Sequence, residues 1–168
     1  MIDTALPPIV GEQPKVLILG SMPSQASLKH QEYYAHPQNS FWWIMSELYD
    51  FKITLSYSER CKVLNQQGVA VWDVLHQCRR AGSLDSAIER QSERANDFIS
   101  WLKTYSSIRS IVFNGTAALK LFKRHYAASL ESDSITLFAC PSTSPAYAAM
   151  AKRRKLEIWK HSMEQARR

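Results

Sequence analysis

The chain has 168 residues, and its apolar content of 45% argues against intrinsic disorder. It has no apolar stretch near the roughly 18 residues of a membrane span, and its first residues lack the features of a secretory signal, so we expect a cytoplasmic protein. The formal net charge of +6 favours a polyanionic partner.

The first third of the chain predicts an extended segment, a strand and a helix. Residues 1–14 contain two adjacent prolines and form an extended lead-in. Residues 15–19 form a fully buried strand, because a continuous apolar run ends there at Gly20. A helix begins after Ser40, where apolar side chains recur at helical spacing and form one face.

The middle of the chain predicts a second helix followed by a second strand. The helix covers residues 57–67, since Ser56 and Glu59 have the spacing of a capping box at its start. The strand covers residues 69–72, which are all apolar, and it ends at Asp73.

The remaining elements follow the same alternation. Apolar spacing predicts a helix over residues 94–106, a strand over residues 108–113 and a helix from Thr116. A strand over residues 135–139 and a final helix follow, and the basic run of residues 152–155 lies on the outward face of that helix. The side chains that we expect to face the core from the last two helices are Ala118, Leu121, Phe122, His125, Leu156, Trp159 and Met163.

Alternating strands and helices favour a parallel sheet covered on both faces. We predict one α/β domain over residues 1–168, a three-layer α/β/α sandwich around a central four-stranded, mainly parallel sheet. Open sheets of this kind bind ligands at the carboxyl ends of their strands. The loops after the first and last strands are therefore the candidate ligand-binding segments.

The loop after the first strand combines a glycine turn with aromatic and amide side chains. Asn39 lies where a helix begins, so it either caps that helix or supplies a catalytic carboxamide. His36 precedes a proline, which favours an extended backbone and a structural hydrogen bond. Tyr34 and Phe41 either pack in the core or stack on a planar ligand.

The loop after the last strand is rich in short hydroxyl side chains and in proline. Hydroxyls and exposed amides suit contacts with phosphate, although Ser and Pro are also typical of turns. The basic run of residues 152–155 either adds affinity for a polyanion or forms a solvated helix face.

The chain lacks the signatures of several common enzyme classes. It has no Walker loop, dinucleotide-binding glycine motif, nucleophile elbow or zinc-protease helix motif. Cys61, Cys78 and Cys140 are widely spaced, and three thiols cannot form a four-cysteine zinc or iron–sulfur site. We therefore expect structural cysteines and no metal.

Three segments are recognisable when they occur in this order. They are Gly20-Ser21-Met22-Pro23, Tyr34-Ala35-His36-Pro37-Gln38-Asn39-Ser40-Phe41-Trp42 and Pro141-Ser142-Thr143-Ser144-Pro145-Ala146. With their spacing over nearly the whole chain, they resemble the motifs of the uracil-DNA glycosylase superfamily. The similarity is greatest to the hypoxanthine-DNA glycosylase (DNA-deoxyinosine glycosylase) branch.

Two positions depart from the better-known branches of that superfamily. Those branches place an Asp or Asn that handles the attacking water two residues after the first glycine, where this chain has Met22. Many of them begin the second loop with a His that stabilises the departing base, where this chain has Cys140. The resemblance leaves Asn39 as the catalytic residue, because the hypoxanthine branch uses an Asn there.

The resemblance implies a base-excision repair enzyme that flips a deaminated base, hypoxanthine foremost, out of double-stranded DNA and hydrolyses its N-glycosidic bond. No lysine is placed for a Schiff base, so the implied enzyme is monofunctional and leaves an abasic site. We also expect a monomer, the simplest state for an enzyme that grips a duplex, with no cofactor, metal cluster or membrane partner. Two alternatives stay open, a uracil or thymine mismatch glycosylase and a non-catalytic binder of DNA lesions.

The resemblance further assigns individual residues. Phe41 stacks on the flipped base with Tyr34 as a second wall, and Asp73 takes the place of the family's base-reading side chain. The implied base-binding set is Gly20, Ser21, Met22, Pro23, Tyr34, Phe41, Asp73 and Asn114. The implied DNA-binding set is His36, Ser142, Thr143, Ser144, Pro145, Ala146, Tyr147, Lys152, Arg153 and Arg154.

Overall fold

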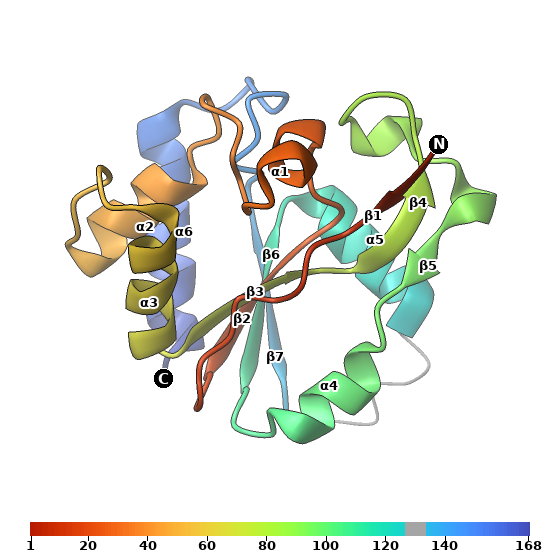
Figure 1. Cartoon of the computed structure of the whole chain (residues 1–168). Coiled ribbons are helices and arrows are strands. Elements are labelled where there is room, and N and C mark those ends of the chain that lie inside the picture. The colour runs from red at the N-terminus through yellow and green to blue at the C-terminus, as the bar shows by residue number, and fades with distance from the viewer. Residues whose placement is uncertain (127–133) are drawn as a thin grey trace.

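A computed structural model of the chain describes residues 1–126 and 134–168. Its centre is a four-stranded sheet in the order β3-β2-β6-β7, in which every neighbouring pair is parallel (Figure 1). The strands are β2 (Val16–Gly20), β3 (Val69–Asp73), β6 (Ser110–Asn114) and β7 (Thr136–Cys140).

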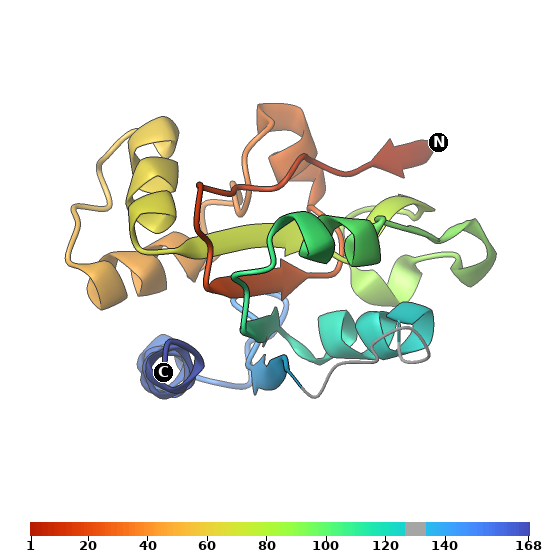
Figure 2. The same ribbon diagram turned by 90° about the horizontal axis from the view of Figure 1, so that it is seen from below.

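Helices cover both faces of this sheet, as the view in Figure 2 shows. One face carries α2 (Phe41–Tyr49), α3 (Tyr57–Gln66) and α6 (Lys152–Ala166). The other face carries α4 (Phe98–Thr104) and α5 (Thr116–Tyr126). The predicted α/β fold, with a four-stranded parallel sheet between helices, is confirmed.

The two-sided cover explains the composition of the strands. Every residue of β2 and β3 is buried, as expected for parallel strands with helices on both faces. The largest side chains with almost no exposed surface come from the helices and from β6, and they are Phe41, Phe98, Phe113, Phe122 and Trp159. The predicted capping box of α3 is also confirmed, because Ser56 and Glu59 each accept a hydrogen bond from the other's backbone amide.

A second sheet was not predicted. It is antiparallel, with the order β1-β4-β5, and consists of β1 (Ile2–Thr4), β4 (Leu75–Arg79) and β5 (Arg94–Ala95). β4 continues the path of β3, but only Leu75 and Cys78 among its residues are buried, so it carries no apolar run that identifies a strand.

Three features differ most from the predictions, beyond shifts of one or two residues at the ends of other elements. Residues 1–14 are more than a lead-in, because they contain β1 and a bridge between Ile9 and Val71. The helix expected over residues 94–106 begins only at Phe98, where the Asp97 carboxylate accepts a hydrogen bond from the Ser100 amide. A short helix, α1 (Gln25–His30), was also missed. Within the described part of the chain, no helix is long and apolar enough to cross a membrane.

Candidate active site

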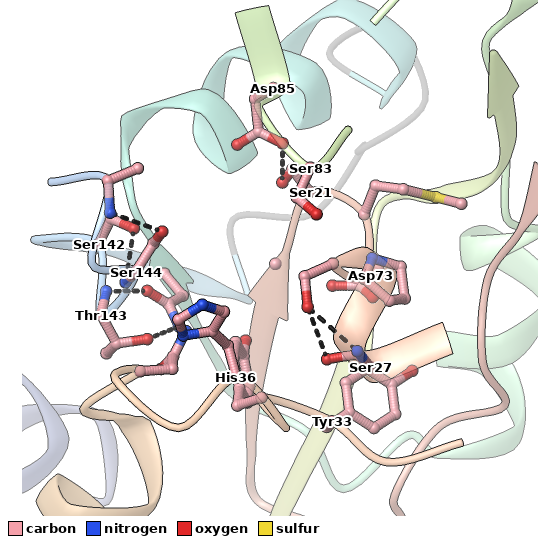
Figure 3. A pocket seen from close by; sticks show the side chains of 18 of the residues that line it. Ser21, Ser27, Tyr33, His36, Asp73, Ser83, Asp85, Ser142, Thr143 and Ser144 are labelled. Carbon is pink, nitrogen blue, oxygen red and sulfur yellow. Dashed lines mark hydrogen bonds between the residues drawn. The ribbon is translucent and has the colours of Figure 1, made fainter. Parts of the chain in front are cut away.

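A cavity of about 300 Å³ opens at the carboxyl ends of β2, β3 and β6. The register of the sheet sets Gly20 beside Asp73, and β6 brings Asn114 to the same edge. Figure 3 shows the hydroxyl-rich loop on one side of the cavity, Asp73 on another and Asp85 on a third. The predicted residues that line it are Gly20, Ser21, Met22, Pro23, Tyr34, His36, Asn39, Asp73, Asn114, Ser142, Thr143, Ser144, Pro145 and Ala146.

Phe41 was expected to stack on a ligand, but the structure places it elsewhere. It is 0% exposed and does not line the cavity. The ring of Tyr34 stacks on it, with 4.0 Å between the ring centroids and 27° between the planes. Tyr34 is therefore the ring of this pair that lines the cavity, and its contact with a planar ligand stays a prediction.

Asn39 holds the start of α2, and its catalytic role stays a prediction. Its Oδ1 accepts a hydrogen bond from the amide of Phe41 at 2.9 Å, which fixes the side chain at the start of α2. Its Nδ2 has no hydrogen-bond partner among the described residues, and Asn39 lines the cavity. The oxygen holds the helix start while the amide nitrogen is left to donate to a ligand.

Asp73 forms the floor of the cavity. It is 3% exposed, and its Oδ2 has no hydrogen-bond partner among the described residues. Gly20 permits this arrangement, because a Cβ there would lie 2.3 Å from Asp73 Oδ1. Burial raises the pKa of Asp73 to about 8, with a further rise from Asp85 and an opposing effect of Arg80. The Asp73 carboxyl is therefore mostly neutral near pH 7, a state in which it both donates and accepts hydrogen bonds.

Asn114 and Thr143 form a reciprocal pair. The Asn114 Nδ2 donates to Thr143 Oγ1, and the Thr143 amide donates to Asn114 Oδ1, both at 2.9 Å. Thr143 also accepts hydrogen bonds through its carbonyl from the amide and the hydroxyl of Ser40. Both polar ends of Asn114 are thus engaged in positioning the loop, and its contact with a base stays a prediction.

The two serine hydroxyls of the second loop face their own backbone. Ser142 Oγ accepts from the Ser144 amide, and Ser144 Oγ accepts from the Ala146 amide, each at 3.2 Å. These are the local turns that Ser favours. The turn explains the composition of the loop, and its contact with phosphate stays a prediction.

The basic run does not face solvent as a whole. Lys155 is 5% exposed, and its Nζ donates to the carbonyl of Tyr147 at 2.7 Å and to that of Ser144 at 3.4 Å. Burial lowers the pKa of Lys155. The prediction that all of residues 152–155 lie outward is wrong at Lys155, because the loop carbonyls need a buried donor.

The other basic residues of this run lie outside the cavity and are exposed. Lys152 Nζ lies 4.0 Å from the centre of the Trp43 ring, and Arg154 forms an ion pair with Glu157 at 2.7 Å. Arg153 has no ion pair within the described residues.

Two of the side chains expected to face the core, Leu156 and His125, are only half-buried. His125 instead binds Glu93 at 2.8 Å.

Sequence reasoning missed one wall of the cavity, which consists of Ser83, Leu84 and Asp85. Ser21 Oγ donates to Asp85 Oδ1 at 2.7 Å. The buried Arg80 fastens this wall to the first loop, since it donates to the carbonyls of Ser83 and Pro23. No pattern in the sequence indicates this contact, because the segment follows an antiparallel strand rather than a strand of the central sheet.

Three more lining residues, Ser24, Ser27 and Tyr33, come from α1 and its flanks. Ser27 is buried and accepts hydrogen bonds from the Ser24 hydroxyl and from the Ala35 amide. This bond fixes the backbone next to Tyr34. The sequence signal for α1 was Ser24 as a helix cap, which is weak before a helix of six residues.

The two positions that depart from the better-known branches carry no exposed reactive group. Met22 is buried and presents an apolar side chain to the cavity. Cys140 does not line the cavity, and burial raises the pKa of its thiol to about 11, which keeps the thiol neutral. Among the described residues, no group of three His, Cys, Asp or Glu side chains is arranged to hold a metal ion.

The fold and the site together define a class. The family model of the uracil DNA glycosylase superfamily matches residues 7–162. The chain therefore belongs to the uracil DNA glycosylase superfamily, and the resemblance of its motifs is confirmed.

Two relatives and one solved structure are similar to this chain over two thirds or more of its length. A protein of Methanosarcina acetivorans named hypoxanthine DNA glycosylase is 32% identical over 158 residues, which cover 94% of this chain and 96% of the relative. A protein of Methanosarcina barkeri with the same name is 30% identical over 116 residues, 68% of this chain and 72% of the relative. The solution NMR structure of a Methanosarcina acetivorans protein, described as a candidate uracil DNA glycosylase, matches with a TM-score of 0.77 at 28% identity, covering 96% of this chain and 98% of that one.

Proposed function

We propose that this protein is a monofunctional DNA glycosylase that removes hypoxanthine from double-stranded DNA and leaves an abasic site. Membership of the superfamily and the names of the two relatives support the reaction class and the base. The observation that carries the proposal is the Asp73 carboxyl, buried on the cavity floor with an oxygen that no described group bonds.

A neutral carboxyl fits the edge of a deaminated base. Hypoxanthine presents an N1–H donor beside an O6 acceptor. The neutral Asp73 accepts from the first and donates to the second, whereas a carboxylate only accepts. Tyr34 lies on the wall of the same cavity and offers its ring to the face of the base.

The bond to the sugar breaks with a separation of charge. The electron pair of the glycosidic bond goes to the base, and positive charge develops on the sugar, by analogy with other glycosidic cleavage. Hydrogen bonds from Asp73 and from the Asn39 Nδ2 stabilise the negative charge on the base. Donors of this kind, fixed in place before reaction, contribute about 2.7–4 kcal/mol each in other enzymes.

Residues around the cavity bind the DNA backbone in this proposal. We assign the backbone amides of residues 142–147 to phosphates beside the lesion, and the exposed Lys152, Arg153 and Arg154 to salt-sensitive affinity. Flipping is cheapest for a weakly paired base, which favours hypoxanthine over intact adenine. We propose that the protein acts as a monomer, and we expect it in the cytoplasm.

A panel of duplexes tests the proposal. Xanthine and uracil present the same pair of donor and acceptor as hypoxanthine to Asp73. Each of the three bases, and a thymine mismatch, is therefore placed in the same sequence context, and abasic sites are cleaved with alkali. We expect the fastest release from inosine DNA. Faster release from uracil or mismatched thymine would assign the protein to those substrates, and tight binding without release from any duplex would make it a lesion binder.

A further inference from the structure

Two carboxyl groups line the cavity, and only one of them has a role so far. Asp73 lies on the floor, and Asp85 lies at the mouth, at the start of a short 3₁₀ helix (Asp85–Ala87). The hydrolysis needs a group that takes a proton from the attacking water and faces the cationic sugar. Met22 is apolar, Cys140 lies outside the cavity, and an Asn amide is not basic. His36 also lines the cavity, but its Nδ1 accepts from the Gln38 amide, so the other nitrogen of the neutral ring is a donor.

Asp85 is held in a fixed place. The Ser21 hydroxyl donates to its Oδ1 at 2.7 Å, and Ser21 belongs to the turn that directly follows β2. The segment before Asp85 is fastened by Arg80, which is 7% exposed and bonds the carbonyls of Ser83 and Pro23. Within the described residues, Asp85 Oδ2 has no hydrogen-bond partner. One carboxyl oxygen is therefore anchored, and the other is left for a water molecule.

The two carboxyls differ in burial and in their polar contacts. Desolvation raises the pKa of the Asp85 carboxyl, and the Ser21 hydrogen bond and Arg80 act in the opposite direction. Asp73 is fully buried and has only Arg80 to favour its charged form. Like charges in one site resist joint ionisation, so the less buried Asp85, which also accepts the Ser21 hydrogen bond, is the better candidate for the ionised carboxylate.

We propose, building on the glycosylase function above, that Asp85 is the catalytic carboxylate that activates the water, with Ser21 as its positioning residue. As the N9–C1′ bond breaks, its electron pair leaves with the base, and the water oxygen forms a bond to C1′. A proton of that water passes to the Asp85 carboxylate and then to solvent, and a proton from solvent completes the neutral hypoxanthine. The negative charge of Asp85 also faces the positive sugar. Asn39 and Asp73 bind the departing base, and Asp85 acts on the attacking water and the sugar.

Single-turnover kinetics on an inosine duplex test the assignment. Asp85→Asn keeps the size of the side chain and removes its basicity, so we expect the rate constant for base release to fall about 100-fold or more, the range of general base catalysis. Binding of the duplex and the melting temperature stay close to those of the wild type. Glu89→Gln is the matched control, because Glu89 is an exposed carboxylate of the same segment that pairs with Arg79 outside the cavity. This variant is expected to react like the wild type.

Three further variants cover a failure of Asp85→Asn to fold. Asp85→Glu keeps a carboxylate and should retain more activity than Asp85→Asn. Ser21→Ala should lower the rate constant without weakening binding, and Ser21→Thr, which keeps the hydroxyl, should restore it. Release by a folded Asp85→Asn within a few-fold of the wild-type rate, or equal rates for Ser21→Ala and Ser21→Thr, overturns this inference and leaves the proposed function intact. A wild-type protein that releases no base overturns both.

Discussion

The ring of Tyr34 lies on the ring of Phe41, with the centroids 4.0 Å apart, and only Tyr34 reaches the cavity. The two rings form two layers, with Tyr34 at the wall of the cavity and Phe41 behind it. Phe41 belongs to the core, where it also meets Trp42 and Trp159 edge-on. We propose that Tyr34 stacks on the base that enters the cavity.

The first prediction separates these layers. Tyr34→Ala removes the stacking face, and base–aromatic stacking is worth about 1–3 kcal/mol, so kcat/KM on an inosine duplex should fall by about 5- to 150-fold. Tyr34→Phe keeps the ring and should stay near the wild-type value. Phe41→Ala should instead lower the free energy of unfolding by about 3–5 kcal/mol in denaturant titrations. Phe41→Leu keeps an apolar side chain in the core and serves for the comparison of activity. If this variant is stable and lowers kcat/KM more than Tyr34→Ala does, the assignment of stacking to Tyr34 is wrong.

The second prediction concerns Asn39 and separates its two functional groups. Asn39→Asp keeps an oxygen to accept from the Phe41 amide and removes the Nδ2 donor. Stability should therefore change little, while base release under single-turnover conditions should fall by about 100-fold or more. Asn39→Ala removes both groups and should also destabilise the fold by about 1 kcal/mol through the lost cap. An Asn39→Asp protein as active as the wild type would leave Asn39 with a capping role alone.

The third prediction follows from the pKa of Asp73, which burial raises from 3.8 to about 8. Between these values the folded protein keeps a proton that the unfolded chain has lost, so this group's stabilising contribution is fully present below the lower value and is lost as pH rises. The free energy of unfolding should fall by up to about 1.4 kcal/mol for each pH unit on account of this group.

Asp73→Asn provides the comparison, since it cannot ionise. The difference in unfolding free energy between this variant and the wild type, measured by urea titration, should grow in favour of the variant from about pH 5 to about pH 8. Comparing the two proteins cancels the other titrating groups. Parallel pH profiles for the two proteins would show that Asp73 has an ordinary pKa.

The fourth prediction distinguishes two neighbouring cations. Arg153 is exposed and has no ion pair within the described residues, so Arg153→Ala should weaken duplex binding and reduce the slope of log K against log salt by about 1. Lys155 holds the carbonyls of Ser144 and Tyr147 instead. Lys155→Ala should slow base release and leave the salt slope unchanged. Equal salt slopes for Arg153→Ala and the wild type would remove Arg153 from the DNA interface.

The parts of the molecule that were predictable from sequence are those whose signal is local. β2 and β3 have continuous apolar runs because both faces of the sheet are covered, and Gly20 and Asp73 were found because they stand where those runs end. The capping box of α3 is equally local, with its two residues three positions apart.

The missed features depend on contacts between distant segments. Asp85 meets Ser21 across 64 positions of the chain, through a strand that has no apolar run. The order of Tyr34 and Phe41 in their stack is decided by which ring the core covers. Lys155 is buried because the carbonyls of a separate loop converge on it. In each case the residue type was visible, and its surroundings were set by tertiary structure.

The most direct test of the central claim is a time course of free hypoxanthine released from an inosine-containing duplex by the wild-type protein. We predict one hypoxanthine for each abasic site formed, with the strand intact until alkali is added. Binding of the duplex without any release of hypoxanthine would contradict the account.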